Sequence, residues 1–392
     1  MTEQLKQELK DWADEARVPQ DLAERALRRR ARRPLLFLVP AAAVSALVVT
    51  VGMLVGLPDR TSTVRPASVV TLPARPSPAP TDVRADVDNM PPKKLIAAGN
   101  YAVSAYWQSK KEKGADGIAT RRQVWSLYNP RTEEYETTPY AWVDVAPGLR
   151  TAAFVEGDLL GRTVGILDMG TGEVIARIPL EHDVLSVDWS PDGTRLLATA
   201  YSAYPYRTKP MGENSYQQQP SSVTGYYVID VPNAKAVFHP PLPEKPDEVS
   251  SPQPPLTWSL DGSLIRQHVP SPEPERFFTP EGEARPKPAD RISEAGVSAV
   301  SPDGKLLLGG AGLPTKITEL EGGKVVGNQK VLQLHAWADD ETVLALKCAR
   351  ECDDEFDSAL SLIKVDGTEV QQLSGFQRTV EDGAWDWVLT PR

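Results

Sequence analysis

The chain has 392 residues and a formal net charge of −10 at neutral pH. This length exceeds what one small core needs but suits one large domain, and the acidic balance argues against general nucleic-acid binding. The charge is uneven: residues 1–33 hold nine Lys or Arg against seven Asp or Glu, a net of +2, which leaves a net of −12 on the remaining residues.

The N-terminal segment, residues 1–33, has the pattern of two short helices separated at Pro19. Leu5, Leu9 and Trp12 fall on one helical face, but so few apolar residues cannot form an independent core. Two interpretations stay open. The segment is either a lipid-surface helix with an arginine anchor or a docking segment for a cytoplasmic protein.

Residues 34–57 contain no charged side chain, and as a helix they would be about 36 Å long, enough to cross a bilayer core. A cleaved signal peptide is the competing interpretation. The long preceding region, the length of the apolar run and the lack of a small-residue cleavage site argue against it. The sequence therefore predicts one uncleaved transmembrane helix.

Orientation follows from five arginines that come directly before the apolar run: Arg28, Arg29, Arg30, Arg32 and Arg33. Basic residues are sparse after the run, so the positive-inside rule places residues 1–33 in the cytoplasm and everything after Leu57 outside. We expect a single-pass protein of the plasma membrane, with its C-terminal domain extracytoplasmic.

Residues 58–92 contain eight prolines and should form neither a helix nor a central strand. Such a segment is extended and semi-rigid. We expect it to be a stalk that lifts the following domain off the membrane.

One motif recurs from residue 93 to the C-terminus. The stretch 186–200, SVDWSPDGTRLLATA, predicts a strand, a Pro-Asp-Gly turn and a second strand. Two more strand-like runs lie between most copies, so each unit has four antiparallel strands in about 40 residues, which is the pattern of a propeller blade. The related stretches, separated by 44, 69, 42, 37 and 50 residues, are centred at Val145, Trp189, Trp258, Val300, Trp337 and Trp387.

This repeat resembles the WD-repeat-like propeller blade of TolB-type proteins, in which a strand ends in Ser-Pro-Asp-Gly. Residues 190–193 and 301–304 match that motif fully, and residues 259–262 have Leu in place of Pro. The resemblance covers roughly residues 93–392 and implies a fold rather than a function.

Ring closure can also be predicted. The strand-like runs at 95–107, 123–128 and 134–138 lack a first strand, and the chain ends with an unmatched one at 384–389. Joining them completes a sixth blade and removes an open edge. The expected fold is all-β: a six-bladed β-propeller over residues 93–392 with Velcro closure, preceded by one transmembrane helix and a short helical cytoplasmic segment. Proline-rich flanks leave the completeness of the fourth blade open.

Catalytic signals are sparse. The sequence contains no hydrolase, zinc-protease or phosphate-binding motif, and its histidines lack metal-ligand spacing. The aspartates of the repeated turns should bond backbone N–H groups. We therefore expect no enzyme activity, no catalytic residue, no metal and no cofactor. The histidines are His182, His239, His268 and His335, and the turn aspartates are Asp192, Asp261 and Asp303.

The insert Tyr201–Tyr227 contains six of the eleven tyrosines. Tyrosine offers rigid contact area with a polar tip, so the insert is a candidate surface for recognising an extracytoplasmic protein or ligand. An unstructured loop is the alternative. In the first interpretation, replacing Tyr204, Tyr206 and Tyr216 with Ser would leave the melting temperature within about one or two degrees of its natural value. The candidate contact residues are Tyr201, Tyr204, Tyr206, Arg207 and Tyr216.

Cys348 and Cys352 are the only cysteines. Outside the cytoplasm such a close pair should form a disulfide. The acidic residues that follow lack calcium-loop spacing and are expected to form a solvated loop.

These features favour a membrane-anchored extracytoplasmic propeller that acts as a non-catalytic binding module in a bacterial cell envelope. One alternative is a transmembrane regulator, similar to an anti-sigma factor, whose residues 1–33 bind a cytoplasmic partner; it lacks the His-x-x-x-Cys-x-x-Cys motif of many such domains. The other is a propeller hydrolase or lyase, which carboxylates and a histidine at the channel mouth would support.

Overall fold

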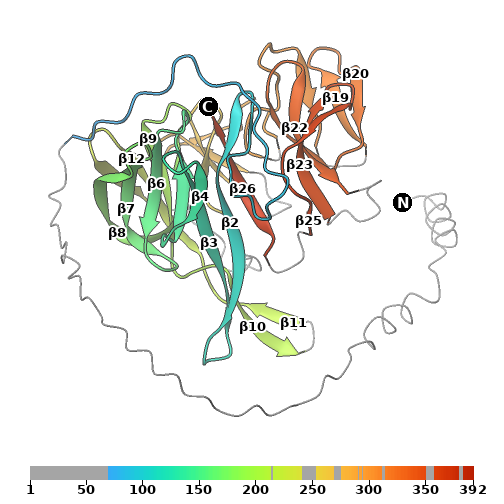
Figure 1. Ribbon diagram of the computed structural model, residues 1–392. Coiled ribbons are helices and arrows are strands. Elements are labelled where there is room, and N and C mark those ends of the chain that lie inside the picture. The colour runs from blue at the N-terminus through green and yellow to red at the C-terminus, as the bar shows by residue number, and fades with distance from the viewer. Residues whose placement is uncertain are drawn as a thin grey trace, which may run out of the picture. The chain divides into compact units, whose positions relative to one another are not determined.

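The computed structural model describes residues 69–212, 215–240, 253–268, 275–289, 291–293, 295–310, 314–349, 357–378 and 383–392. All regular secondary structure in these ranges is β-strand (Figure 1). The helices predicted in residues 1–33 and 34–57 lie outside the described residues. Within the described ranges, no helix has the length and apolar character needed to span a membrane.

The first sheet contains seven strands and includes the last strand of the chain. The C-terminal strand β26 pairs antiparallel with β2, from Tyr101 opposite Pro391 to Gln108 opposite Trp385. The strands are β1 (Ala97–Ala98), β2 (Tyr101–Lys113), β3 (Ala119–Asn129), β4 (Glu134–Thr137), β10 (Arg207–Gly212), β11 (Ser215–Gln218) and β26 (Trp385–Pro391).

The second sheet also has seven strands, in the order β13-β12-β9-β8-β7-β6-β5. Its longest strand, β8, pairs with β7 through its first half and with β9 through its second half. Two four-stranded units therefore share one continuous strand. The strands are β5 (Trp142–Val145), β6 (Thr151–Glu156), β7 (Gly161–Asp168), β8 (Glu173–Trp189), β9 (Arg195–Tyr201), β12 (Val223–Asp230) and β13 (Lys235–His239).

Three smaller sheets complete the described domain. The third sheet contains β14 (Thr257–Trp258), β15 (Ile265–Gln267), β16 (Arg276–Phe278) and β17 (Ala284–Arg285). The fourth contains β18 (Leu306–Leu308), β19 (Thr315–Glu319) and β20 (Val325–Gln329), and a bridge joins Val300 to Leu307. The fifth contains β21 (Gln333–Trp337), β22 (Thr342–Cys348), β23 (Asp357–Lys364), β24 (Glu369–Gln372) and β25 (Gln377–Arg378).

The recurring Ser-Pro-Asp-Gly turn has a local physical cause. The Ser190 hydroxyl donates to Asp192 at 2.6 Å and accepts from the Arg195 main-chain N–H at 2.9 Å. Asp192 in turn accepts the Thr194 N–H, and Gly193 takes φ of +69°. The same bonds recur at the turns of the third and fourth sheets, so the predicted structural role of these aspartates is confirmed.

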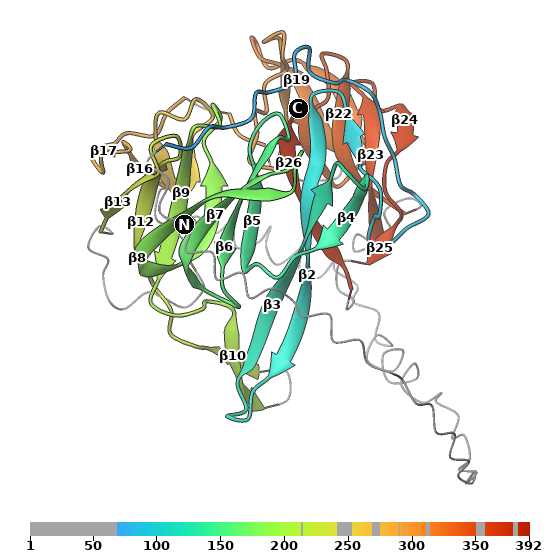
Figure 2. The same cartoon turned by 60° about the vertical axis from the view of Figure 1, so that its left-hand side comes forward.

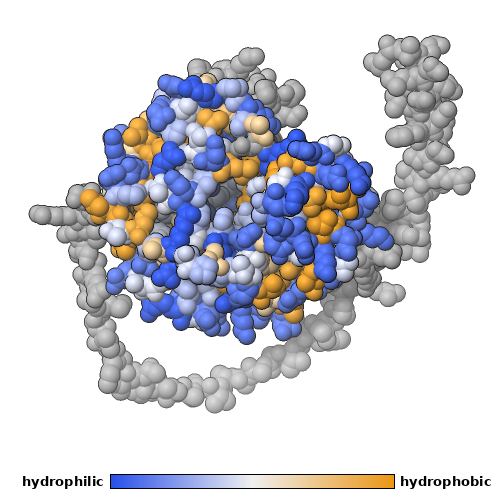
Figure 3. Space-filling view, turned by 90° about the horizontal axis from the view of Figure 1, so that it is seen from above, coloured by the Kyte–Doolittle hydropathy of each residue, from blue (hydrophilic) through white to orange (hydrophobic). Residues whose placement is uncertain are grey.

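Apolar faces join four of the five neighbouring pairs of sheets, and the fifth sheet packs back against the first, which is a propeller arrangement (Figure 2). Seen from above, hydrophilic residues predominate at the surface and apolar residues form separate patches between them (Figure 3). Apolar clusters join the first sheet to the second (Trp125 with Phe154), the second to the third (Leu197 with Trp258), the fourth to the fifth (Ile317 with Val343) and the fifth to the first (Leu344 with Trp385).

Residues 58–92 are predicted to form a stalk that stands apart from the domain. Their described part, residues 69–92, instead packs along the surface of the domain. Val70 is buried, and its N–H donates to a carbonyl of the β12–β13 turn at 2.7 Å. The N–H of Asp86 donates to the Leu373 carbonyl at 2.8 Å. The backbone N–H and C=O groups of an extended chain have no hydrogen-bond partners within that chain. Here carbonyl groups of the folded sheets and turns accept hydrogen bonds from residues 69–92. Residues 69–92 are therefore part of the folded domain.

Candidate functional site

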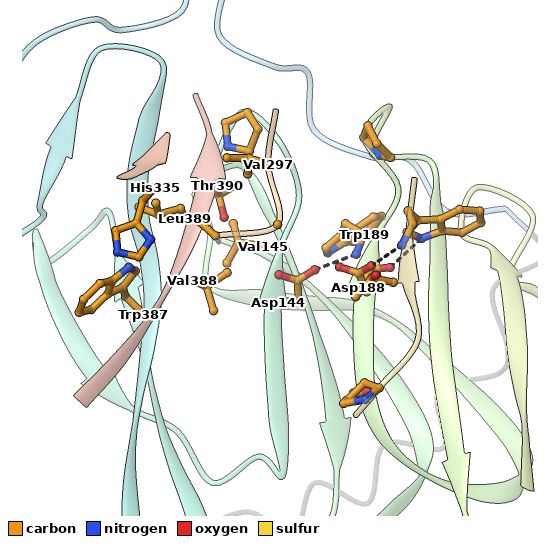
Figure 4. A pocket seen from close by; sticks show the side chains of 18 of the residues that line it. Asp144, Val145, Asp188, Trp189, Val297, His335, Trp387, Val388, Leu389 and Thr390 are labelled. Atoms are coloured by element: carbon orange, nitrogen blue, oxygen red, sulfur yellow. Dashed lines mark hydrogen bonds between the residues drawn. The ribbon is translucent and has the colours of Figure 1, made fainter. Parts of the chain in front are cut away.

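A cavity of about 1140 Å³ lies where the sheets converge (Figure 4). Every sheet contributes to its wall. The lining segments come from β26, β5, β8, β14, the residues before β18, and β21. This central cavity is therefore the channel that the propeller resemblance implies.

Two aspartates of the cavity wall occupy equivalent positions in consecutive units. Asp144 of β5 accepts the main-chain N–H of Trp189 at 2.7 Å, and Asp188 of β8 accepts that of Trp258 at 3.0 Å (Figure 4). Each carboxylate thus bonds the inner strand of the next unit. Both lie deep in the protein but stay partly exposed to the cavity. Burial raises the pKa of both groups, and the charge of Asp188 raises the pKa of Asp144 further.

His335 of β21 lies in another part of the wall. Its side chain is 6% exposed, and its ring packs edge-on against Trp387 with centroids 5.6 Å apart. Neither ring nitrogen has a hydrogen-bond partner among the described residues, and neither does Nε1 of Trp189. Burial lowers the pKa of His335 to about 4, so the imidazole is neutral at pH 7.

The cavity wall therefore contains carboxylates and histidine, the feature named above as support for a hydrolase or lyase. A neighbouring carboxylate would raise the pKa of His335. Burial lowers that pKa instead, so the environment of His335 is governed by burial and not by a carboxylate. Figure 4 places His335 beside Trp387, apart from Asp144 and Asp188. The only histidine–carboxylate approach at this wall, among the described residues, joins the half-exposed His268 to Glu275 at 3.7 Å. These residues do not assemble an acid–base pair with a nucleophile.

A second candidate site projects beyond the sheets (Figures 1 and 2). We call it the arm: residues 109–123, which form the far ends of β2 and β3 and their turn, together with the β10–β11 hairpin. Thr208 of β10 pairs with Ala119 of β3, and β11 pairs with β10. Within the predicted insert, β10 and β11 therefore form a strand hairpin that extends the first sheet, whereas Tyr201 and residues 223–227 belong to β9 and β12 of the second sheet.

The predicted contact residues of the insert divide into two groups, which corrects the expectation of one exposed tyrosine surface. Tyr201 and Tyr204 are 3% and 6% exposed. Their hydroxyls donate to main-chain carbonyls, at 2.8 Å for Tyr201 and 2.9 Å for Tyr204. Tyr206 is half-buried, with its ring 5.6 Å from that of Tyr204. These three side chains pack at the root of the arm, whereas Tyr216 is 55% exposed and Arg207 lies on the arm itself.

Sequence reasoning missed the basic character of the arm. Residues 109–123 and 207–219 hold seven Lys or Arg and three Asp or Glu, a net of +4 in a chain of net −10. Lys111 Nζ lies 5.2 Å from the centre of the Tyr216 ring, so β2 and β11 present these side chains on the same face. The run of basic residues on both sides of the turn at 114–117 is the signal that would have indicated a charged hairpin.

The other predicted residues are only partly within the structure. Cys348 ends β22 and is buried, and no free thiol occurs among the described residues. Cys352 and the five arginines at 28–33 lie outside the described residues. The disulfide and the membrane orientation therefore stay predictions.

Comparison with known proteins gives fold-level likenesses at low similarity. No family model matches the chain, and no curated protein matches its sequence. Hydrazine synthase of Kuenenia stuttgartiensis is 15% identical over 58% of this chain and 63% of its own, with a TM-score of 0.30. TolB of Acinetobacter baumannii is 14% identical over 73% and 66%, with a TM-score of 0.34. The Cps50 (Swd1) β-propeller domain of Myceliophteria thermophila is 10% identical over 72% and 89%, with a TM-score of 0.35.

This chain spans less than two thirds of the hydrazine synthase and TolB chains. Likenesses of this size do not identify an activity or a partner. The chain is a β-propeller protein on the arrangement of its own sheets.

Proposed function

We propose that this chain is a membrane-anchored, extracytoplasmic, six-bladed β-propeller that acts as a non-catalytic binding module for a protein partner. The strand pairing among the described residues supports a division into six units, and the β26–β2 pairing supports Velcro closure of the ring. The units are β26-β2-β3-β4, β5-β6-β7-β8, β8-β9-β12-β13, β14-β15-β16-β17, the Val300 bridge with β18-β19-β20, and β21-β22-β23-β24.

The observation that carries the binding role is the arm. No blade needs it, because β10 and β11 lie between two strands, β9 and β12, that pair directly with each other. It carries exposed Met211 and Tyr216, and its net charge is +4, whereas the net charge of the rest of the chain is −14 (−10 minus +4). An exposed apolar side chain and an exposed aromatic side chain among charges are typical of a protein interface.

The position of the arm fits an anchored protein. Val70 contacts the β12–β13 turn, and Arg75 donates to carbonyls of the turn that begins β9. The arm leaves from the opposite end of β9, at Tyr201. The chain that precedes residue 69 therefore enters the domain at the end of β9 that lies away from the arm.

A capture experiment tests the proposal. The full chain in detergent and a variant with residues 208–218 replaced by a Gly-Ser linker are each cross-linked to envelope proteins, which are then identified by mass spectrometry. We expect one protein to be enriched by the natural chain and lost with the variant, while both melt cooperatively. Equal recovery of the same proteins by both chains would refute the role of the arm.

A second candidate function, a hydrolase or lyase with its site in the central channel, rests only on the presence of carboxylates and histidine among the residues that line the cavity. Turnover of ester, glycoside or uronate substrates that is lost in His335→Gln would support it. The regulator alternative depends on residues 1–33, outside the described ranges, and stays a prediction.

A further inference from the structure

We propose that the arm recognises an extended, acidic segment of its protein partner, and that this segment adds as a strand to the open edge of β11. The inference rests on the binding function proposed above and names the chemistry of the partner.

The edge of the arm is the first observation. In the order β1-β2-β3-β10-β11, β11 ends the sheet and pairs with β10 alone among the described strands. Its sequence, Ser-Tyr-Gln-Gln, has neither charge nor proline. Edge strands are usually protected by lysine, proline or a cover, because an open edge pairs readily with another chain.

The other edge of the arm has that protection. The pairing of β2 with β26 ends at Gln108, and the free stretch beyond it, residues 109–113, reads Ser-Lys-Lys-Glu-Lys. The lysines of residues 109–113 therefore protect the β2 edge from strand addition, whereas the β11 edge has no such protection.

The charge around β11 is the second observation. Lys209 stands opposite Gln217 in the β10–β11 register, and Lys111 approaches the Tyr216 ring. Within the described residues, carboxylates pair with Lys110, Arg122 and Arg207 of the arm. They leave four basic side chains without an ion-pair partner in those residues: Lys111, Lys113, Arg121 and Lys209. Acidic side chains of an added strand would neutralise them.

A peptide satisfies both observations at once. Only a polypeptide backbone offers the alternating N–H and C=O groups that an open strand edge lacks. Its side chains would also cover Met211 and Tyr216, which are 61% and 55% exposed. A polyanion without a peptide backbone would meet the charge and leave the edge unpaired.

The test uses the full chain in detergent and a fluorescein-labelled peptide, acetyl-Glu-Val-Glu-Val-Glu-Val-Glu-Val-amide, followed by anisotropy. We expect saturable binding that weakens about tenfold or more in the double variant Lys111→Glu with Lys209→Glu. The matched control, Lys235→Glu with Lys316→Glu, makes the same change in net charge at exposed positions away from the arm, and should bind as the natural chain does. The same peptide N-methylated at alternate residues keeps its charge but loses one edge of hydrogen bonds, and should bind about tenfold more weakly.

No saturable binding, equal binding of the N-methylated peptide, or equal loss in the control variant would each overturn strand addition. Complete competition by dextran sulfate at matched charge would overturn it as well, in favour of general polyanion binding. If the peptide fails while envelope capture still requires the arm, only the strand-addition inference is refuted. If capture is also independent of the arm, the proposed binding function fails with it.

Discussion

Tyr204 lies at the root of the arm and supports it from within the core. Its ring belongs to the apolar cluster that joins the second and third sheets, and its hydroxyl donates to the Arg121 carbonyl of β3 at 2.9 Å. Truncating a buried aromatic side chain costs about 3–5 kcal/mol. Losing one buried hydrogen bond costs about 1–1.5 kcal/mol.

These values give different expectations for two substitutions. Because a domain of this size changes its melting temperature by about 2 °C per kcal/mol, Tyr204→Phe should lower the melting temperature by about 2–3 °C and Tyr204→Ala by about 6–10 °C. The exposed Tyr216 of the same insert is the matched control, and Tyr216→Ala should change the melting temperature by about 1 °C or less.

The assay is circular dichroism at a fixed scan rate, because unfolding of a large domain is often irreversible. If Tyr204→Ala and the natural chain melt at the same temperature, Tyr204 is not a core residue. Equal losses at Tyr204 and Tyr216 would instead mean that the arm folds as part of the core.

Three further outcomes are expected. Removing residues 384–392 should leave β2 without its partner strand β26 and the core without Trp385, so size-exclusion chromatography should show aggregation. A monomeric truncated chain with an unchanged melting temperature would contradict closure of the ring by β26. The fold lowers the pKa of His335 from 6.5 to about 4, so as the pH falls the unfolded chain takes up a proton before the folded chain does. The free energy of unfolding should therefore decline by up to about 3 kcal/mol between those two pH values. Chemical denaturation of His335→Leu should lack this decline, and a pH profile equal to that of the natural chain would contradict the reasoning. The denatured, unreduced protein should show no free thiol if Cys348 and Cys352 are paired, and two reactive thiols would exclude the pair.

The turns of the propeller could be predicted because their chemistry is local. Ser190, Asp192 and Gly193 satisfy one another within four residues, so the motif is visible in sequence wherever it recurs. The pairing of the last strand with β2 was also predictable, since one run lacked a first strand and another lacked a blade.

The arm was not predictable in the same way. Most residues of its strands are exposed, so alternation between apolar and polar residues does not develop in residues 109–113 or in β10 and β11. Whether a tyrosine is buried depends on distant segments: Tyr201 bonds a carbonyl more than fifty residues away, and Tyr204 one on β3. No pattern within the insert separates these two residues from Tyr216.

The cavity shows the same limit. Asp188 stands two residues before the recognised serine, and Asp144 occupies the matching place in a weaker copy, but their partners are main-chain N–H groups of the next unit. No sequence motif surrounds His335. That its two ring nitrogens lack hydrogen-bond partners among the described residues is visible only in the packed structure.

The course of residues 69–92 has a mechanical consequence. Any pull on the chain from its N-terminal side loads the Val70 contact first, then the Arg75 contact at the turn before β9, and later the Asp82–Arg392 ion pair. These contacts would yield one after another, as in peeling, before force reaches β2 and the sheets. Peeling the whole segment would release about 80 Å of extended chain. Under such a pull residues 69–92 would therefore yield while the sheets stay folded.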